Sequence, residues 1–161
     1  FLVLISQAKA YACSILNVDI GTSVSAASGK FDFLETFDPS PYGDMYSVRF
    51  TIPAKDYCED SNLENADLEV IVYNSQIAGI NVLSWDPNVK NEIYDFTNSF
   101  IGSVGEDLKK DRAGIKDLSL GNLIIVYSKY EHQEQIHELL EITNGQFSNY
   151  VTGEAILDAN G

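Results

Sequence analysis

Leu68-Glu-Val-Ile-Val-Tyr73 and Ile80-Asn-Val-Leu-Ser-Trp85 are two nearly continuous apolar runs, joined by the short link Asn74-Ser-Gln-Ile-Ala-Gly79. Short runs rich in β-branched residues are typical of strands, and apolarity at successive positions indicates a sheet covered on both faces. A parallel crossover normally needs a dozen or more residues. The link therefore predicts either an antiparallel hairpin or a crossover helix that is shortened or missing.

More elements are predicted on both sides of this segment. Met45-Tyr-Ser-Val-Arg-Phe-Thr-Ile52 alternates as a half-buried strand does, and Ile15-Leu-Asn-Val-Asp-Ile20 alternates more loosely. Leu123-Ile-Ile-Val-Tyr127 is a further strongly apolar strand. Ser103-Val-Gly-Glu106 has the Ser-x-x-Glu form of a capping box, which predicts a helix from about Gly105 to Ala113.

The C-terminal part has a different pattern. Tyr130 to Ile142 places apolar residues on one helical face and glutamates on the other, which predicts an amphipathic surface helix. Residues 131–161 are therefore expected to form this helix and a C-terminal extension, following a domain over residues 13–130. Together the elements predict an α+β or α/β fold, with a small mixed β-sheet or open barrel flanked by two or three helices.

The composition indicates a folded and strongly acidic chain. Of its 161 residues, 45% are apolar, which is enough for one domain with a buried core. The formal net charge is -14, and only 10 residues are Lys or Arg. Such a charge repels phosphate backbones and anionic lipid head groups, so no nucleic-acid partner is expected.

The first residues have the character of a targeting segment. Phe1-Leu-Val-Leu-Ile5 is apolar and is followed by two Ala-x-Ala patterns, Ala8-Lys-Ala10 and Ala10-Tyr-Ala12. These features predict that residues 1–12 are the remnant of a signal peptide, with a short first strand as the alternative. No apolar run in the sequence approaches the roughly 20 residues that span a bilayer, and a membrane-anchored precursor stays open.

The chain has two cysteines, Cys13 and Cys58. In an exported chain, an even pair favours one disulfide, which here would close a loop of about 45 residues. The alternative is two free thiols in a reducing compartment. A zinc site would need more ligands at shorter spacing, so it is not expected.

Several stretches, taken in order, resemble the protease-associated domain. Pro41-Tyr-Gly-Asp-Met-Tyr-Ser-Val-Arg-Phe-Thr-Ile-Pro-Ala-Lys-Asp-Tyr-Cys58 is similar to the family's Tyr-Gly turn, strand, Pro and Cys. Leu68 to Tyr73 resembles its central strand, and Ser75-Gln-Ile-Ala-Gly-Ile-Asn-Val-Leu83 is similar to its Ala-Gln-x-Ala-Gly-Ala stretch. Asn98-Ser-Phe-Ile-Gly-Ser-Val-Gly-Glu-Asp-Leu-Lys-Lys110 resembles the family's Pro-Ser-x-Ile-Ser, Gly and Leu-Lys-Lys stretch, and the similarity spans roughly Ile15 to Ser128.

One family segment has no counterpart here. The family usually has an Arg-Gly-x-Cys-x-Phe-x-x-Lys stretch after its central strand, whereas in this chain Tyr73 is followed almost at once by Ser75. The resemblance is to the luminal type found in vacuolar sorting receptors and transmembrane ubiquitin ligases. It implies a small sheet-and-helix domain that recognises peptides or proteins through its loops.

The sequence carries no clear motif for catalysis or for metal binding. The sequence has no Gly-x-Ser-x-Gly elbow and no Gly-rich phosphate loop. On a helix, His132 and His137 would stand about 140° apart and would not share a face as zinc-binding histidines do. Asp56, Glu59 and Asp60 lack the Asp-x-Asp-x-Asp-Gly order of a calcium loop. The sequence therefore predicts no catalytic residue, no metal and no cofactor, and it does not favour an enzyme.

The sequence hypothesis is a secreted or luminal, non-catalytic module at the cell surface or in the endomembrane lumen that binds a protein or peptide. Its expected contacts are Tyr57 in the acidic loop Asp56 to Asp67, and Trp85 and Asp86 in the turn that follows the second apolar run. One alternative is a structural subunit of an extracellular or membrane-bound assembly. Another is a hydrolase that uses a carboxylate pair which no motif identifies.

Overall fold

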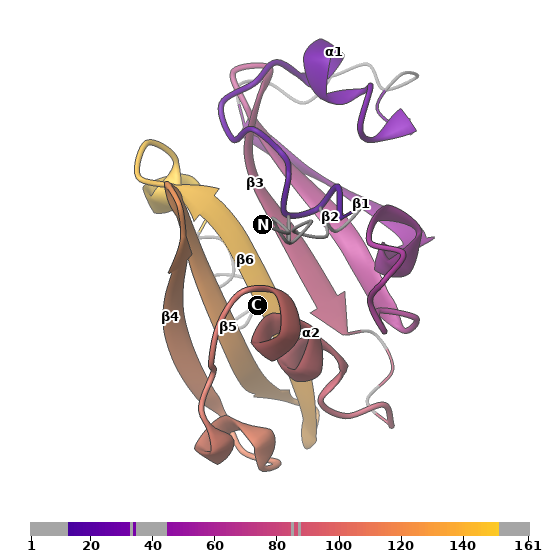
Figure 1. Cartoon of the computed structure of the whole chain (residues 1–161), viewed down its shortest axis with the longest axis vertical. Coiled ribbons are helices and arrows are strands. Elements are labelled where there is room, and N and C mark those ends of the chain that lie inside the picture. Colours follow the sequence, from indigo (N-terminus) through magenta and orange to yellow (C-terminus); the bar gives the residue numbers. More distant parts are fainter. Residues whose placement is uncertain (1–12, 33, 35–44, 85, 87, 152–161) are drawn as a thin grey trace, which may run out of the picture.

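The computed structural model of the chain describes residues 13–32, 34, 45–84, 86 and 88–151. In this part of the chain a six-stranded sheet runs in the order β1-β2-β3-β6-β5-β4, and every pairing is antiparallel (Figure 1). Its strands are β1 (Met45–Pro53), β2 (Ala66–Tyr73), β3 (Gln76–Ser84), β4 (Gly114–Leu120), β5 (Leu123–His132) and β6 (Gln135–Asn144). The helices are α1 (Val24–Ala27), α2 (Glu92–Phe100) and the 3₁₀ helices η2 (Ala54–Tyr57) and η3 (Glu106–Lys109). The predicted α+β class is confirmed, although the sheet is antiparallel and not mixed.

The two apolar runs at the centre of the sequence form a hairpin. Tyr73 at the end of β2 lies opposite Gln76 at the start of β3. The two residues between them, Asn74 and Ser75, have φ angles of 48° and 60°. Positive φ at both central residues is the pattern of a type I′ turn, whose twist matches that of the flanking strands. The short link therefore makes a two-residue turn, and there is no crossover helix.

This turn leads to a first prediction. Replacing Ser75 with Gly should stabilise the protein by about 0.5 kcal/mol, because Gly occupies positive φ without the Cβ strain that Ser bears. Urea unfolding would measure the change. Ser25→Gly in helix α1 is a matched control that should destabilise by a similar amount, since Gly weakens a helix interior. An unchanged or lower stability of Ser75→Gly would contradict the assigned turn.

The predicted helix from Tyr130 to Ile142 is wrong. This segment is the second half of another hairpin, in which β5 and β6 are joined by Gln133 and Glu134 at φ angles of 50° and 62°. Strand β6 also pairs with β3, so it lies near the centre of the sheet. The expected boundary between a domain at 13–130 and a helical extension at 131–161 accordingly falls inside β5. Cross-strand partners on both sides override the local helical propensity of this glutamate- and leucine-rich stretch.

Two other predicted elements differ. The segment from Ile15 to Ile20 forms turns instead of a strand. The predicted helix from Gly105 to Ala113 is reduced to η3, and no side chain caps it, so the expected capping box is not formed. Helix α2 precedes that region, and its Asn98 accepts a hydrogen bond from the Val104 amide at 3.0 Å. This bond fixes the chain after α2 in a non-helical path before η3 begins.

The main core lies between one face of the sheet and the segments that cover it. Helix α2 crosses this face over β3 and β6, and the N-terminal segment covers the other end (Figure 1). Its largest fully buried side chains are Tyr127, Phe31, Phe96, Ile15, Leu63, Leu68, Ile77, Ile80, Ile93, Ile125 and Leu140. A smaller cluster of Ile71, Ala78, Phe147 and Val151 lies apart from this core.

The predicted disulfide between Cys13 and Cys58 is present. Both cysteines are buried, and the Ser14 amide donates to the Tyr57 carbonyl at 2.7 Å beside them. The N-terminal segment is thereby fixed to η2 and the loop after it. The predicted signal remnant, residues 1–12, lies outside the described residues. Within the described ranges, no helix is long and apolar enough to cross a membrane.

Candidate functional site

A surface hollow of about 350 Å³ lies beside the disulfide, and we call it the Tyr57 hollow. It is lined by Cys13, Ser14, Asn17, Lys30, Asp56, Tyr57 and Glu59. The N-terminal segment forms one side and the η2 region forms the other. Residues distant in sequence therefore meet here because the disulfide joins their two segments.

Local hydrogen bonds hold the η2 side of the hollow. The Cys58 amide donates to the Lys55 carbonyl at 2.9 Å, and the Lys55 amide donates to the carbonyl of buried Leu63 at 3.1 Å. On the opposite side, the Asn17 side-chain amide donates to the Cys13 carbonyl at 2.9 Å. Backbone bonds and a covalent bond thus position Tyr57 before any ligand arrives.

Tyr57 is the best-defined side chain of this hollow. Its hydroxyl donates to Asp32 Oδ1 at 2.7 Å, and its ring lies 5.4 Å from the ring of Phe31 between centroids. Burial, followed by the hydrogen bond to Asp32, raises the pKa of the Tyr57 phenol. Tyr57 therefore stays neutral at physiological pH and presents a fixed aromatic ring that is part exposed.

The rim of the Tyr57 hollow is acidic. Asp56 and Glu59 face one lysine, Lys30. Lys30 is already engaged, because its Nζ donates to the Asn17 carbonyl and lies 3.9 Å from Asp19 Oδ2. The carboxylates of Asp56 and Glu59 can therefore contact a cationic ligand. The ammonium group of Lys30 is already bonded within the protein.

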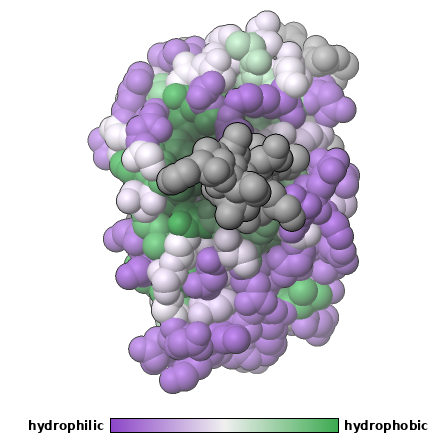
Figure 2. Space-filling view, in the orientation of Figure 1, coloured by the Kyte–Doolittle hydropathy of each residue, from purple (hydrophilic) through white to green (hydrophobic). Residues whose placement is uncertain are grey.

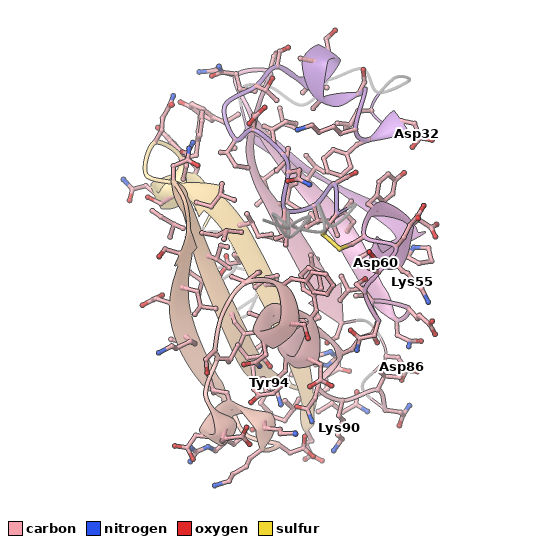
Figure 3. All side chains as sticks on the ribbon, in the orientation of Figure 1. Asp32, Lys55, Asp60, Asp86, Lys90 and Tyr94 are labelled. Carbon is pink, nitrogen blue, oxygen red and sulfur yellow. A yellow bond between two sulfur atoms is a disulfide. The ribbon has the colours of Figure 1, made fainter. Side chains whose placement is uncertain are left out.

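The neighbouring charges extend this acidic surface. Figure 3 places Asp32, Asp60 and Lys55 on the side of the molecule that carries η2. Lys55 donates to the Glu64 carboxylate, and this bond holds the pKa of Glu64 below its usual value. The cation of this region is thus also paired internally, which leaves the acidic character of the surface unchanged.

A second hollow, of about 510 Å³, lies near the β5–β6 turn, and we call it the Asn88 hollow. It is lined by Asn88, Lys90, Asp111, Glu131, Glu134, Gln135 and Ile136. Lys90 forms an ion pair with Asp111 across it. In Figure 2 the lower end of the molecule, where Figure 3 labels Lys90, is covered by hydrophilic residues. The lining of this hollow includes the apolar Ile136 but no aromatic residue comparable to Tyr57.

The predicted contact residues do not form one site. Tyr57 lines the first hollow, whereas Asp86 adjoins the second, where its Oδ1 accepts from the backbone and side-chain amides of Asn88 at 2.9 and 3.0 Å. The two hollows share no lining residue. Trp85 lies outside the described residues. Tyr57 and Asp86 thus border different hollows, and their role as contacts for a partner stays a prediction.

Sequence reasoning missed the other side of the Tyr57 hollow, namely Asn17, Lys30 and Asp32. Asn17 lies in the segment that was predicted as a strand, and the sequence predicted no role in binding for Lys30 or Asp32. The one available signal was the pair of cysteines, because a disulfide to Cys58 places the N-terminal segment against η2.

A buried carboxylate, Glu138, holds the start of helix α2. Its oxygens accept from the backbone amides of Ile93 at 3.3 Å and Tyr94 at 2.9 Å, and from the Tyr127 hydroxyl at 2.7 Å. The N-cap residue of the helix, Asn91, makes no side-chain cap. Glu138 therefore supplies from β6 the acceptor that a helix start requires.

Lys129 completes this buried group. It lies opposite Glu138 in the β5–β6 register, and its Nζ donates to Asn91 Oδ1 at 2.6 Å and lies 5.9 Å from the Tyr94 ring centroid. Burial raises the pKa of Glu138 and lowers that of Lys129. Neither residue lines either hollow. The group positions α2 and does not face a ligand site.

No arrangement in the described part of the chain matches a metal centre built from three or more His, Cys, Asp or Glu side chains. The two histidine rings are close, with centroids 6.1 Å apart, and His137 also stacks on Tyr130 at 5.6 Å. This is an aromatic cluster on the β5–β6 hairpin.

Comparisons with protein-family models, curated proteins and solved structures find no match for this chain. The case for a function therefore rests on the geometry of the Tyr57 hollow.

Proposed function

We propose that this protein is a secreted or luminal, non-catalytic interaction module that binds a cationic peptide or protein segment at the Tyr57 hollow. The observation that carries the proposal is the fixed Tyr57 ring, held by Asp32 and Phe31 in an acid-rimmed hollow beside a disulfide.

Rigidity favours binding because an ordered anchor loses little conformational entropy when a partner arrives. Tyrosine supplies a large ring with a polar end, and tyrosines are frequent among the residues that dominate interface energies. The Tyr57 ring lies against buried Phe31, and its hydroxyl donates to the exposed Asp32. Its part-exposed edge is therefore a preformed contact for an apolar or cationic side chain.

Charge favours a cationic partner. The hollow carries Asp56 and Glu59, while Lys30 is engaged with Asp19 and Asn17. The whole chain has a formal charge of -14, which steers cationic ligands toward it and repels anionic ones. Binding at this hollow should consequently weaken as salt is added.

The disulfide supports the proposed compartment. Disulfides persist mainly in oxidising environments such as the secretory lumen and the cell exterior. The resemblance to protease-associated domains, which stays a prediction, implies the same class of luminal recognition module. Both lines support the compartment in the proposal.

The proposal predicts a specific effect of Tyr57. Peptides selected from a random display library against the purified protein should be enriched in Lys and Arg. Tyr57→Ala should weaken the best selected peptide by tenfold or more, the loss of about 1.4 kcal/mol or greater that is typical of an aromatic anchor. Fluorescence anisotropy with the labelled peptide would measure the dissociation constant.

Tyr150→Ala is the matched control, since Tyr150 is an exposed tyrosine that stacks on Tyr73 and does not line the hollow. It should change binding by less than about twofold. Replacing Asp56 and Glu59 together with Asn and Gln should weaken binding and flatten its salt dependence. Equal affinity of wild type and Tyr57→Ala, with both variants folded by circular dichroism, would rule out this hollow as the binding site.

A further inference from the structure

The sheet consists of two three-stranded halves joined by one short seam. The halves are β1-β2-β3 and β6-β5-β4, and β3 meets β6 over four register pairs, from Ile80 with Ile142 to Leu83 with Leu139. The hairpins on either side are longer, with eight pairs between β2 and β3 and ten between β5 and β6. Figure 1 shows β3 and β6 diverging above the seam.

Two side-chain contacts support the seam at its ends. At one end, Ser84 Oγ accepts from the Glu138 amide at 2.7 Å and is 3.3 Å from the Glu138 carbonyl. At the other, Thr143 Oγ1 donates to the Ala78 carbonyl at 2.8 Å. Each of these polar contacts has a donor and an acceptor.

The middle of the seam is different, because it brings two acceptors together. Asn81 lies directly opposite Glu141 in the register, and they are 5% and 4% exposed. The Asn81 amide nitrogen donates to Glu69 Oε2 on β2 at 3.1 Å. Since the amide nitrogen and oxygen diverge, Asn81 Oδ1 is directed to the other side, where β6 carries Glu141. Within the described residues, neither Asn81 Oδ1 nor Glu141 Oε1 has a hydrogen-bond partner.

A buried acceptor without a donor costs free energy, and two facing acceptors add repulsion when one is charged. One proton changes this, because a protonated Glu141 can donate to Asn81 Oδ1. We infer that Glu141 binds this proton and shares it with Asn81, so that the seam between the two halves of the sheet tightens in acid and loosens toward neutral pH.

The surroundings of Glu141 do little to stabilise an ionised carboxylate. Its register partner on β5 is the apolar Val126, and burial raises the pKa of Glu141 to about 7. The strand register and the helical turn at 148–151 show which other residues lie on the same side of the sheet as Glu141. The charged or titratable residues there are Asp67, Glu69, Tyr73, Asp117, Tyr130, His132, His137 and Tyr150. Arg49 on β1 is in register with Glu69 on β2, and β1 lies three strands from β6, the strand of Glu141.

The sign of the effect follows from proton linkage. The pKa of Glu141 rises from 4.5 to about 7 on folding, so the folded state binds the proton more tightly. The stabilisation from this proton is complete below pH 4.5 and is lost as pH rises through 7. Other carboxylates titrate in acid as well, so the effect of Glu141 is measured as a difference between variants.

Glu141→Gln provides that difference, because a glutamine amide can donate to Asn81 Oδ1 at every pH. At pH 8 the variant should unfold about 6 °C above the wild type, and at pH 4.5 the two should unfold within about 2 °C of each other. Glu134→Gln, at the exposed β5–β6 turn, is the control and should follow the wild type at both pH values. Hydrogen exchange, corrected for intrinsic rates, should show wild-type seam amides less protected at pH 8 than at pH 5, with β4–β5 amides unchanged.

A direct titration keeps the inference testable if the variant does not fold. The carboxyl carbon of Glu141, followed by NMR in the wild type, should titrate above pH 6, and a midpoint below pH 5 would overturn the inference. Equal destabilisation of Glu141→Gln at both pH values would also overturn it. So would a rise in the unfolding temperature of the wild type, but not of Glu141→Gln, on adding Ca²⁺ or Mg²⁺ at pH 8. That result would assign the acceptor pair to a cation instead.

Discussion

Replacing Glu138 with Ala is expected to destabilise the protein by about 3–5 kcal/mol, the cost typical of removing one partner from a buried charged group. The change would leave the Tyr127 hydroxyl and the amides of Ile93 and Tyr94 without their acceptor. It would also leave Lys129, which is 3% exposed, without the carboxylate opposite it. Denaturant unfolding at neutral pH would measure the loss.

Two comparisons separate this role from a general effect of losing a glutamate. Glu138→Gln retains one acceptor oxygen, so it should lose less stability than Glu138→Ala. Glu134→Ala removes an exposed carboxylate from the neighbouring turn and should change stability by no more than about 0.5 kcal/mol. A loss below about 1 kcal/mol for Glu138→Ala would show that α2 does not depend on this cap.

Removing the disulfide is expected to destabilise the protein by about 4 kcal/mol. The two cysteines are separated by 45 residues, and closing a loop of that length lowers the entropy of the unfolded chain by this order. The Cys13→Ala/Cys58→Ala double variant should therefore unfold at a much lower urea concentration. Since the bond fixes the N-terminal segment against η2, peptide binding at the Tyr57 hollow should weaken as well.

Reduction of the wild type provides the matching control. Dithiothreitol should lower the unfolding midpoint of the wild type toward that of the double variant and should leave the variant unchanged. A wild-type midpoint that does not respond to the reductant, with the thiols shown to be free, would contradict a stabilising role for the bond.

Strands with a continuous or alternating apolar pattern were predictable from sequence. The runs at Leu68 and Ile80, the alternating stretch at Met45 and the run at Leu123 all form strands close to their expected positions. Their side-chain pattern is local, and it is the main determinant of whether a segment can bury one or both faces. The short link at Asn74 likewise limited the central pair to a hairpin or an incomplete crossover.

Strand β6 was not predictable in this way. The glutamates from Glu131 to Glu141 have helical spacing, so they indicated a solvent-facing side of a helix. In the fold Glu138 faces helix α2, and Glu141 lies on the opposite face at the seam. Both depend on partners in β3, β5 and α2, which are up to about sixty residues distant and leave no local pattern.

Part of the candidate site could likewise be predicted from the sequence, and part depended on the tertiary structure. Tyr57 was accessible to sequence reasoning as an aromatic residue in an acidic loop, and the cysteine pair indicated the disulfide that holds it. Asp32, Phe31 and Lys30 acquire their roles only when that disulfide brings the N-terminal segment to η2.

Local chemistry was therefore enough to predict an acidic α+β chain, to limit its central strands to a hairpin or an incomplete crossover, and to favour a disulfide between the two cysteines. The tertiary structure alone decided that β6 joins the two halves of the sheet, that Glu138 and Glu141 are buried, and that Tyr57 and Asp86 lie in separate places. The reason is physical: apolar periodicity is a property of neighbouring residues, whereas strand order and the burial of charge depend on contacts between distant ones.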